Sequence, residues 1–249
     1  MTELLFLTHN RRAFTQHALT ALRVNTDWTR VSKLWLFDDS STDGTLQLVE
    51  QFASQCTCET FIVRGGWGSP VDAMGLFLEN TTSQLVAKID NDTMLPPGWL
   101  LDCERLMEEN TDVDLLGIEA RGRANSDGHV QIPNCAPSGH VRKVVPAEFI
   151  GGIGVFRNAA FRDLPMPRRE NQQPGRKWFG WQHYQHRFKL RAAWIEPSLE
   201  VFLLDRMNVE PWRSLSKEYV RAGWQRQEPY LYGPQWKPVW EWAKEMACE

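Results

Sequence analysis

Long apolar runs are missing from this chain of 249 residues. No stretch reaches the roughly 18 consecutive apolar residues by which a membrane-spanning helix is recognised, so we expect no membrane span. The first apolar stretch, residues 4–7, is followed at once by polar residues and has no cleavage region, which argues against a signal peptide. These absences lead us to expect a cytoplasmic protein.

Cysteine is scarce and irregularly spaced, with five residues in all. Cys56 and Cys58 form a close pair, but no second pair follows, so a structural zinc site is not expected. An odd and scattered set of cysteines also fits a reducing compartment better than a disulfide framework. The sequence contains no internal repeat and no separate linker, and we expect residues 1–249 to form a single domain.

Acidic and basic residues are divided unevenly along the chain. The net charge is −3, yet residues 151–249 hold 16 basic and 11 acidic residues. The basic excess is concentrated between Arg157 and Arg191. Such a division suggests two surfaces with different ligands, and a solvated basic face is the simpler alternative.

Strand-like and helix-like segments alternate over the first 120 residues. Apolar residues at helical spacing predict helices, and short apolar runs between polar stretches predict strands. Strands are expected at residues 3–8, 33–37, 60–63, 85–89 and 115–118, and helices at residues 12–24, around 46–52, at 71–78 and at 99–107. This rhythm predicts an α/β protein with a mostly parallel central sheet that helices cover on both faces.

The second half of the sequence is less regular. Residues 122–146 are rich in Gly, Asn, Ser and Pro and are expected to form a long connection or a flexible arm, and residues 165–175 a mobile loop. The further elements expected are a glycine-broken strand at 149–156, a helix at 177–190 and strands near 192–195 and 201–204. From residue 211 we expect a helical, Trp-rich C-terminal extension that packs on the domain, and an interfacial helix in peripheral contact with a membrane is the alternative.

Three polar clusters fall where expected strands end. They are Thr8-His9-Asn10, Asp38-Asp39 and Asp90-Asn91-Asp92. Ligands of parallel α/β sheets bind beyond the carboxyl ends of the strands, so the three clusters predict one site. Asp90 and Asp92 would point the same way if the strand geometry continued, and two adjacent carboxylates are costly unless a cation or hydrogen-bond donors offset them. A solvated acidic pair at a strand end is the simpler alternative.

Four segments resemble motifs of the family 2 glycosyltransferases, in the same order and spacing. Residues 8–11 resemble the T-x-N-R strand end of that family, and residues 38–45 closely resemble its D-D-x-S-x-D-G-T signature. Residues 90–92 resemble its D-x-D metal motif, and residues 151–157 its acceptor-side glycine strand. The resemblance covers roughly residues 1–205.

The resemblance implies a GT-A fold, which is a Rossmann-like αβα sandwich. It implies a nucleotide-sugar-binding half at residues 1–120 and an acceptor-binding half at residues 121–210, followed by the extension at residues 211–249. The implied reaction is the metal-dependent transfer of a sugar from a UDP-sugar to an acceptor hydroxyl, with inversion at the sugar carbon.

The resemblance also implies roles for single residues. Asp39 would bind the nucleotide base and His9 would pack on it, Asp90 would face the ribose, and Asp92 would hold Mn²⁺ or Mg²⁺. The metal motif contains both Asp90 and Asp92, and oxygen ligands suit these ions. A bound cation would neutralise the charge that develops on the leaving diphosphate. The donor-binding residues expected are Thr8, His9, Asn10, Arg11, Asp38, Asp39, Lys88 and Asp90. Support of the turn and of a helix cap is the alternative role for Asp38.

The sequence departs from the family at the catalytic base. Where the family has an acidic pair, as in W-E-D, this chain has Trp181-Gln182-His183. Histidine can act as a general base near neutral pH, so His183 is the expected base. A third metal ligand or a histidine on a helix face is the alternative role for His183, and His186 and Glu170 are the other candidate bases.

The acceptor is expected to bind in the second half of the chain. The expected contacts are Gly152, Arg176, Trp178, Trp181 and Gln182. Basic residues with interleaved aromatic residues suit sugar rings, and they equally suit a polyanion with stacking bases. A saccharide or protein-linked glycan is the expected acceptor, and the hydroxymethylated bases of phage-type DNA are the alternative. A non-catalytic nucleotide-sugar-binding protein is a third possibility.

Overall fold

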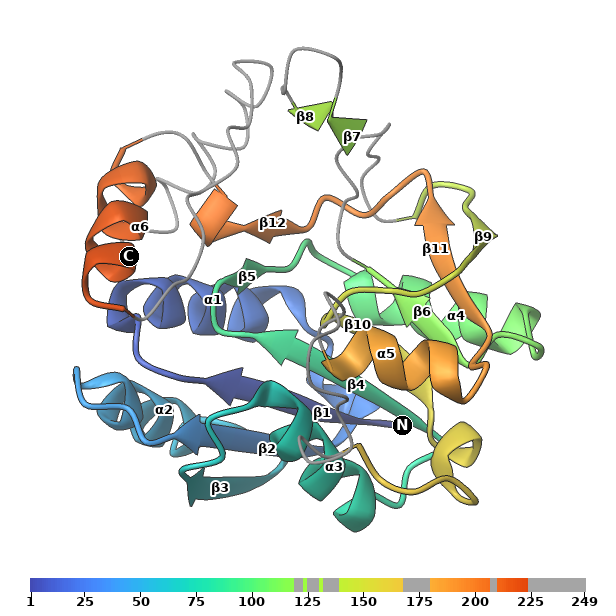
Figure 1. Cartoon of the computed structure of the whole chain (residues 1–249), viewed down its shortest axis with the longest axis horizontal. Coiled ribbons are helices and arrows are strands. Elements are labelled where there is room, and N and C mark those ends of the chain that lie inside the picture. The colour runs from blue at the N-terminus through green and yellow to red at the C-terminus, as the bar shows by residue number, and fades with distance from the viewer. Residues whose placement is uncertain (119–122, 125–129, 132–138, 168–179, 207–209, 224–249) are drawn as a thin grey trace.

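An eight-stranded sheet forms the centre of the molecule, in the order β3-β2-β1-β4-β10-β6-β11-β9 (Figure 1). The computed structural model describes residues 1–118, 123–124, 130–131, 139–167, 180–206 and 210–223. The strands are β1 (Thr2–Thr8), β2 (Val31–Asp39), β3 (Glu59–Gly65), β4 (Leu85–Asp90), β6 (Leu115–Gly117), β9 (Lys143–Ala147), β10 (Gly154–Arg157) and β11 (Ala192–Glu196). Two small sheets pair β5 (Thr93–Met94) with β12 (Phe202–Leu203), and β7 (Arg123–Ala124) with β8 (Val130–Gln131).

Most of the large sheet is parallel. Strands β3, β2, β1 and β4 are paired in parallel, and β6 and β11 are parallel to each other. Strand β10 runs antiparallel to both β4 and β6, so the two parallel groups point the same way. The expectation of a mostly parallel α/β sheet is therefore confirmed.

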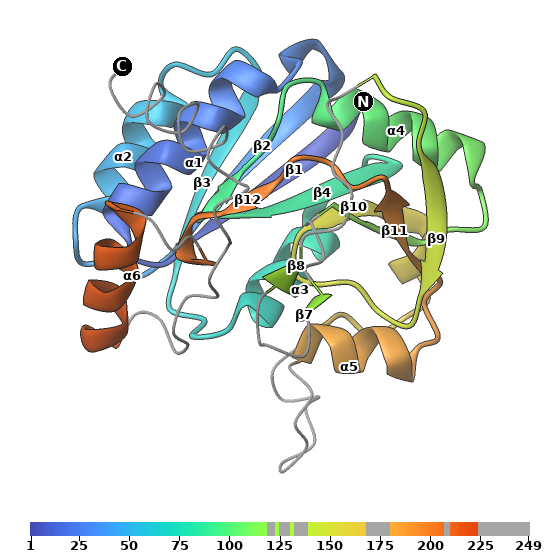
Figure 2. The same cartoon turned by 90° about the horizontal axis from the view of Figure 1, so that it is seen from above.

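Helices cover both faces of the sheet. They are α1 (Arg12–Asn25), α2 (Thr45–Ala53), α3 (Pro70–Asn80), α4 (Trp99–Glu109), α5 (Gly180–Arg187) and α6 (Trp212–Arg221). Apolar residues of α1, α2 and α4 form one buried cluster with the sheet, and those of α3 and α5 form a second cluster. Figure 2 shows these two groups of helices on opposite sides of the strands. Every residue of β1 is buried, as a strand covered on both faces requires.

One side chain, that of Asp43, organises the starts of two helices beside the strand ends. Its Oδ2 accepts a hydrogen bond from the backbone N–H of Arg12, the first residue of α1, at 2.8 Å. Its Oδ1 accepts from the backbone N–H of Thr45, the first residue of α2, at 3.1 Å. The free N–H groups at a helix start need such acceptors, so the turn after β2 is tied to the turn after β1.

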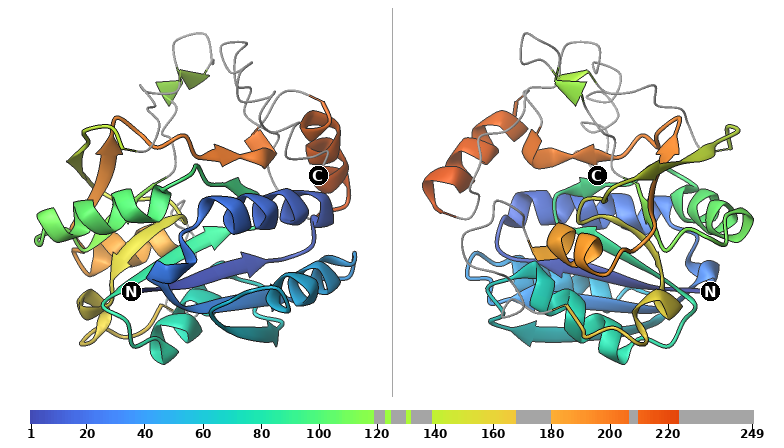
Figure 3. Two further views of the ribbon diagram at one scale, coloured as in Figure 1. Left: turned by 180° about the vertical axis from the view of Figure 1, so that it is seen from behind. Right: turned by 45° about the vertical axis from the view of Figure 1, so that its right-hand side comes forward.

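After β11 the chain returns to the first half of the molecule. Strand β12 pairs with β5, and α6 packs against α1, which Figure 3 shows from two sides. The ring of Phe14 in α1 lies 5.9 Å from that of Trp212 and 4.9 Å from that of Tyr219. A helix at the start of the expected C-terminal extension is therefore present. The other tryptophans predicted for that extension, Trp224, Trp236, Trp240 and Trp242, lie outside the described residues.

The structure corrects two expectations for the second half. The segment 122–146 was expected to be a long connection or flexible arm, but it contains β7, β8 and most of the edge strand β9. The residues of β9 are mainly exposed, and its sequence does not alternate between apolar and polar residues, so the strand is recognised by its backbone pairing with β11.

The glycine-broken strand is shorter than the expected 149–156 and begins only at Gly154. At Ile150 the backbone groups are already used, because Gln185 of α5 donates to the backbone oxygen of Ile150 and accepts from its N–H. These groups are therefore not available to a neighbouring strand. In the described parts of the chain, no helix is long and apolar enough to cross a membrane.

Candidate functional site

Three strand ends meet at one edge of the sheet. Thr8 at the end of β1 is in register with Asp38 of β2, and Leu7 is in register with Asp90 at the end of β4. The parallel order β2-β1-β4 brings these carboxyl ends side by side, where α/β sheets bind their ligands. The prediction that the three polar clusters converge is confirmed.

A pocket of about 270 Å³ opens at this edge. Its apolar wall is formed by Leu7 and by Pro70, Val71 and Met74 of α3. Its other lining residues are Thr8, His9, Arg11, Asp39, Lys88, Asp90, Asn91, Gly152 and Trp181. The pocket therefore includes six of the eight expected donor-binding residues, and the two that do not line it are Asn10 and Asp38.

His9 and Asp39 form one end of the pocket. Nδ1 of His9 lies 2.6 Å from the backbone oxygen of Asp39. A carbonyl oxygen only accepts, so Nδ1 carries the proton and the ring orientation is fixed. The carboxylate of Asp39 accepts from the backbone N–H of Gly68, with its two oxygens at 3.0 and 3.2 Å. A carboxylate has room for further donors, so Asp39 can still bind a ligand.

Asn10 and Asp38 link the end of β1 to the end of β2 and to the turn that follows it. Both are buried, with Asn10 3% and Asp38 2% exposed. Asp38 accepts from the hydroxyl of Thr8 at 3.0 Å and from the backbone N–H of Ser41 at 3.0 Å. Asn10 accepts from the backbone N–H of Thr42 at 2.8 Å. Their observed contacts support the turns, as the alternative role for Asp38 anticipated.

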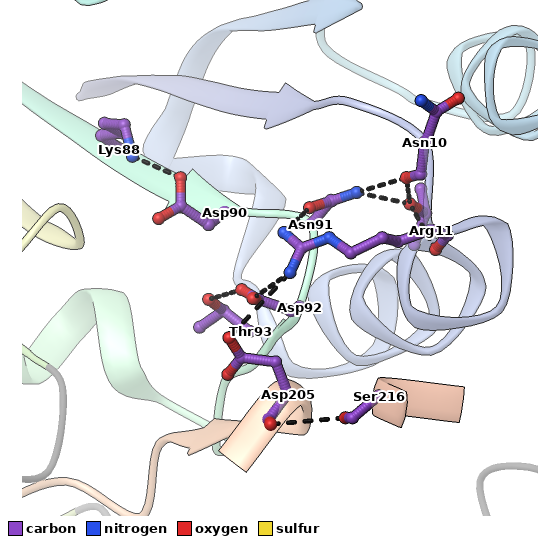
Figure 4. Close-up of polar contacts among 10 residues, drawn as sticks. Asn10, Arg11, Lys88, Asp90, Asn91, Asp92, Thr93, Asp205 and Ser216 are labelled. Atoms are coloured by element: carbon purple, nitrogen blue, oxygen red, sulfur yellow. Dashed lines mark hydrogen bonds and ion pairs between the residues drawn. The ribbon is translucent and has the colours of Figure 1, made fainter. Parts of the chain in front are cut away.

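Arg11 is the centre of a polar network at the other end of the site (Figure 4). Its Nη1 donates to Oδ2 of Asp92 at 2.9 Å, and its Nη2 donates to Oδ1 of Asn91 at 2.7 Å. Nη1 also lies 4.0 Å from Oδ2 of Asp205. Burial opposes the charge on Arg11, but Asp92, Asp205 and Asp90 outweigh it and raise the pKa of the guanidinium above its ordinary value.

The backbone under this network is in an uncommon conformation. Asn10 and Arg11 have φ angles of 51° and 64°, in the left-handed region. Asparagine tolerates that region, whereas for arginine it costs about 1–2 kcal/mol. Surrounding contacts must compensate, and Asn91 supplies one, since its amide nitrogen donates to the backbone oxygen of Asn10 at 2.8 Å.

Sequence reasoning gave no role to Asn91 or Asp205. Asn91 stands between the two aspartates of the motif, and its amide contacts both Arg11 and Asn10. Asp205 lies in a 3₁₀ turn, Leu204–Arg206, directly after β12. The backbone N–H of Leu204 donates to the backbone oxygen of Asp92 at 2.7 Å, which fixes this turn beside the motif. No pattern in the sequence points to Asp205, because its place depends on the pairing of β12 with β5.

Lys88 and Asp90 form an ion pair on the pocket side of β4. Lys88 is 5% exposed, whereas the side chain of Asp90 is 31% exposed. Gly152 lies against this pair, and a Cβ atom at Gly152 would be 3.3 Å from both Nζ of Lys88 and Oδ2 of Asp90. The missing side chain at Gly152 therefore leaves room for the ion pair and for a ligand above it.

Asp90 and Asp92 do not point the same way, as they would have done if the strand geometry had continued. Strand β4 ends at Asp90, and a turn over residues 91–92 precedes β5. Asp90 is directed to Lys88, and Asp92 is directed to Arg11 (Figure 4). The burial of Asn91 between them produces the turn, so each carboxylate has its own cationic partner.

Helix α5 brings only part of the expected acceptor and base residues to the pocket. Trp181 lines it, and among the described residues its buried Nε1 has no hydrogen-bond partner. Gln182 and His183 are half-buried on α5 and do not line the pocket, and His186 is exposed. Arg176, Trp178 and Glu170 lie outside the described residues.

The carboxylate oxygens of Asp92 and of the nearby Asp205 are of the kind that divalent cations prefer as ligands. Oxygens of Asp92 and Asp205 face one point, which is occupied by Nη1 of Arg11. Over the described ranges, no three His, Cys, Asp or Glu side chains are grouped so that they could hold a metal by themselves. Mg²⁺ in particular is commonly bound by one or two carboxylates together with substrate phosphates, so a set this small is sufficient for it.

Solved structures with a similar fold carry nucleotide ligands. TarS 1–349 of S. aureus in complex with UDP is 14% identical, with 96% of this chain and 77% of that chain covered and a TM-score of 0.60. For the mannosyltransferase PcManGT of Pyrobaculum calidifontis in complex with GDP-Man and Mn²⁺, the identity is 15%, the coverage 99% and 72%, and the TM-score 0.56. For GalNAc-T7 with UDP, GalNAc and Mn²⁺, the identity is 10%, the coverage is 81% of this chain and 42% of that chain, and the TM-score is 0.59.

At such identities these likenesses show the fold alone. In two further TarS structures the chain spans 59% and 34% of the matched chains. No curated protein sequence matches this chain significantly.

A family model described as glycosyl transferase family 2 matches residues 5–164. The matched range contains all three strand-end clusters and ends after β10. The mostly parallel sheet between two helical layers is the GT-A fold, as the sequence resemblance implied. Because the match covers more than half of the sequence, the chain belongs to glycosyl transferase family 2.

Proposed function

We propose that this chain transfers a hexose from a UDP-sugar to a hydroxyl group of a saccharide or glycan acceptor, with Mn²⁺ or Mg²⁺ as cofactor. One observation carries the proposal: a single pocket at the strand ends joins the carboxylate of Asp39 at one end to the cations of Arg11 and Lys88 at the other. A nucleotide sugar has a matching order of groups, with a base, a diphosphate and a sugar. Family membership supports the proposal, as do fold relatives with UDP or with GDP-Man and Mn²⁺.

The nucleotide base is assigned to the end formed by His9 and Asp39. The His9 ring is fixed by its hydrogen bond to the backbone of Asp39 and is exposed, so a flat face is available for stacking. Asp39 can accept a hydrogen bond from an N–H of the base while it keeps its contact with Gly68. Uracil, which has such an N–H, fits this pair.

The diphosphate is assigned to the end formed by Arg11, Lys88 and the motif carboxylates. A nucleoside diphosphate leaves readily only when its growing negative charge is stabilised, and preorganised cations do this well in a water-poor pocket. Asp92 would hold the divalent cation with Asp205 nearby, whereas Asp90 is directed to Lys88, and the bound ion would act as a Lewis acid on the diphosphate. Lys88 adds a fixed positive charge, because Asp90 and its burial hold it in place.

The acceptor is assigned to the side of the pocket formed by Gly152 and Trp181. Trp181 lines this side of the pocket, and its buried N–H is a donor that no described group uses. In the proposed step the acceptor oxygen forms a bond to the anomeric carbon as the bond to the UDP oxygen breaks, which inverts that carbon. His183 lies in the same helix as Trp181 but outside the pocket lining, and it would take the proton of the attacking hydroxyl once the acceptor reaches this helix.

The nucleic-acid alternative has no support of its own. It depended on basic and aromatic residues whose central part, residues 168–179, lies outside the described residues. The saccharide acceptor therefore remains the proposal. The experiment below distinguishes an active transferase from a non-catalytic nucleotide-sugar-binding protein.

The test begins with a thermal-shift screen of nucleotide sugars with Mn²⁺, because a ligand that binds only the folded state raises Tm. Release of UDP is then measured with saccharide acceptors, with and without EDTA. Asp39→Asn is expected to weaken donor binding, whereas Asp112→Asn, an exposed change just before β6 at the opposite edge of the sheet, is expected to have no effect. Failure to bind any nucleotide sugar would refute the proposal, and tight binding without UDP release would favour a non-catalytic role.

A further inference from the structure

We infer that Arg11 occupies the position of the divalent cation at Asp92 until the donor arrives, so that the metal ion enters only together with the diphosphate. The inference rests on the proposed function and adds an order of binding to it. Arg11 would then move from Asp92 to the diphosphate within the same pocket.

The contacts of the guanidinium are those of a cation in a carboxylate site. Nη1 of Arg11 lies 2.9 Å from Oδ2 of Asp92 and 4.0 Å from Oδ2 of Asp205. Nη2 is held by Asn91 at 2.7 Å, which orients the planar group. A divalent cation bound to the same oxygens would be in direct repulsion with this guanidinium, so the two cannot share the site.

The guanidinium is poorly exposed, with 15% of the Arg11 side chain accessible. Two carboxylates and one amide oxygen therefore compensate a charge that water reaches only in part. A metal ion that arrives alone would have to displace this charge without giving it a new partner. We therefore expect the nucleotide-free protein to bind Mn²⁺ weakly.

A diphosphate removes this obstacle in two ways. Its oxygens add ligands for the metal ion, which finds no group of three carboxylate or histidine ligands among the described residues. It also offers a new anionic partner to Arg11, whose side chain already lines the pocket.

Arg11 is not fully satisfied in its present place. Its buried Nε has no hydrogen-bond partner in the part of the chain that the structure describes. A buried donor without a partner is unfavourable, so the resting arrangement is one that a ligand can improve. The side chain of Arg11 already lines the pocket, so the move begins from within the proposed donor site.

The experiment measures Mn²⁺ binding by the electron paramagnetic resonance signal of free Mn²⁺, with and without UDP. The nucleotide-free Arg11→Met variant is expected to bind Mn²⁺ about 5–150-fold more tightly than the unmodified protein, which is the usual range for coupled sites. The mutual enhancement between UDP and Mn²⁺ is expected to be smaller in the variant, because the metal ion no longer has to displace Arg11. UDP without metal is expected to bind the variant more weakly.

Arg12→Met is the matched control. Arg12 is the next residue, it is exposed, and its change removes the same charge without touching Asp92. Arg11→Lys is the second variant for the case that Arg11→Met does not fold. A single ammonium group cannot bridge Asn91 and Asp92 as a guanidinium does, so this variant should also bind Mn²⁺ more tightly than the unmodified protein.

The outcomes distinguish this inference from the proposed function. If both folded variants bind Mn²⁺ no more tightly than the unmodified protein, while all bind Mn²⁺ in the presence of UDP, the inference is wrong and the proposed donor site stands. If neither UDP nor Mn²⁺ is bound by any of the proteins, the proposed function is wrong and the inference falls with it.

Discussion

The side-chain amide of Gln185 makes two hydrogen bonds with the backbone of Ile150, accepting from its N–H at 2.8 Å and donating to its oxygen at 3.1 Å. Gln185 is completely buried. This pair joins α5, which carries Trp181, to the segment that carries Gly152. This amide therefore links the two parts of the chain that bring Trp181 and Gly152 to the pocket.

Gln185→Leu is expected to destabilise the protein by about 2–4 kcal/mol, because two buried backbone groups lose their partners. Donor turnover should fall as well, since Trp181 and Gly152 lose their common support. Gln185→Glu is the comparison, because it keeps the acceptor for the N–H of Ile150 but loses the donor. Urea unfolding measures the first effect and UDP release the second. A Gln185→Leu protein with unchanged stability would contradict this account.

Gly152→Ala is expected to weaken donor binding with little change in stability. The new methyl group would lie 3.3 Å from Nζ of Lys88 and from Oδ2 of Asp90, closer than is comfortable. Both atoms end flexible side chains and can yield by a few tenths of an ångström, so the fold tolerates the change. The ion pair would then shift into the pocket, and we expect the Kd for UDP-sugar to rise about tenfold, or about 1.4 kcal/mol. Calorimetric titration gives the Kd, and an unchanged value would show that the ligand does not use this side.

Substitution of Asp38 is expected to lower mainly the stability of the protein, and substitution of the neighbouring Asp39 mainly its affinity for UDP. Asp38 is buried and accepts from Thr8 and from the backbone of Ser41, so Asp38→Asn should cost about 1–3 kcal/mol of stability. Asp39 lines the pocket, so Asp39→Asn should raise the Kd for UDP with a smaller loss of stability. Thermal unfolding and calorimetric titration on both variants make the comparison. Equal effects of the two changes on binding would contradict the assignment of Asp38 to the turn.

The sheet and the location of the site could be predicted because they follow from local patterns. Buried strands such as residues 2–8 have an apolar centre, residues 4–7, and parallel pairing puts their carboxyl ends together. Polar residues at the ends of such strands, such as Thr8 and Asp90, must therefore lie near one another. The residues of the three strand-end clusters could therefore be assigned to one site without knowledge of side-chain contacts.

The remaining parts of the site depend on contacts between distant segments. The turn that separates Asp90 from Asp92 exists because Asn91 is buried against Asn10 and Thr15, which the motif itself does not encode. Asp205 reaches Arg11 only because β12 pairs with β5. Strand β9 has no apolar alternation, so only its pairing with β11 reveals it. Local sequence patterns do not predict such pairings between distant segments.

The ionised side chain of Glu3, in β1, is expected to stabilise the fold, and this stabilisation is expected to be lost in acid. It is 1% exposed and accepts from Nε1 of Trp35 at 2.8 Å and from the backbone N–H of Thr82 at 2.9 Å. Burial opposes its ionised form, but these hydrogen bonds outweigh burial and lower its pKa. The stabilisation is therefore complete above the unfolded pKa of about 4.3 and is lost as the pH falls through the folded pKa.

Glu3→Gln should cost about 1–3 kcal/mol at pH 7 and make the stability less sensitive to pH below about 4.3. Gln has one acceptor oxygen where Glu has two, so some of the donors lose their partner. Glu59→Gln, an exposed change in β3, is the control and should leave both quantities unaltered. Urea unfolding from pH 7 to pH 3 measures them. A parallel loss of stability in Glu3→Gln and in the unmodified protein below pH 4 would contradict the linkage.

The histidines of α5 are expected to differ in their effect on the chemical step. His183 is half-buried on the helix that carries Trp181, whereas His186, one turn later, is exposed. His183→Ala is expected to lower kcat about 10²–10⁴-fold, the usual contribution of a general base, without changing the Kd for UDP. His186→Ala should retain nearly full activity. His183→Asp places a carboxylate where the sequence resemblance to the family implies one, and it should recover part of the lost rate. A large loss in His186→Ala would move the base to that residue. A loss in His183→Ala that Asp does not restore, with weaker UDP binding, would make His183 a support for the donor site instead.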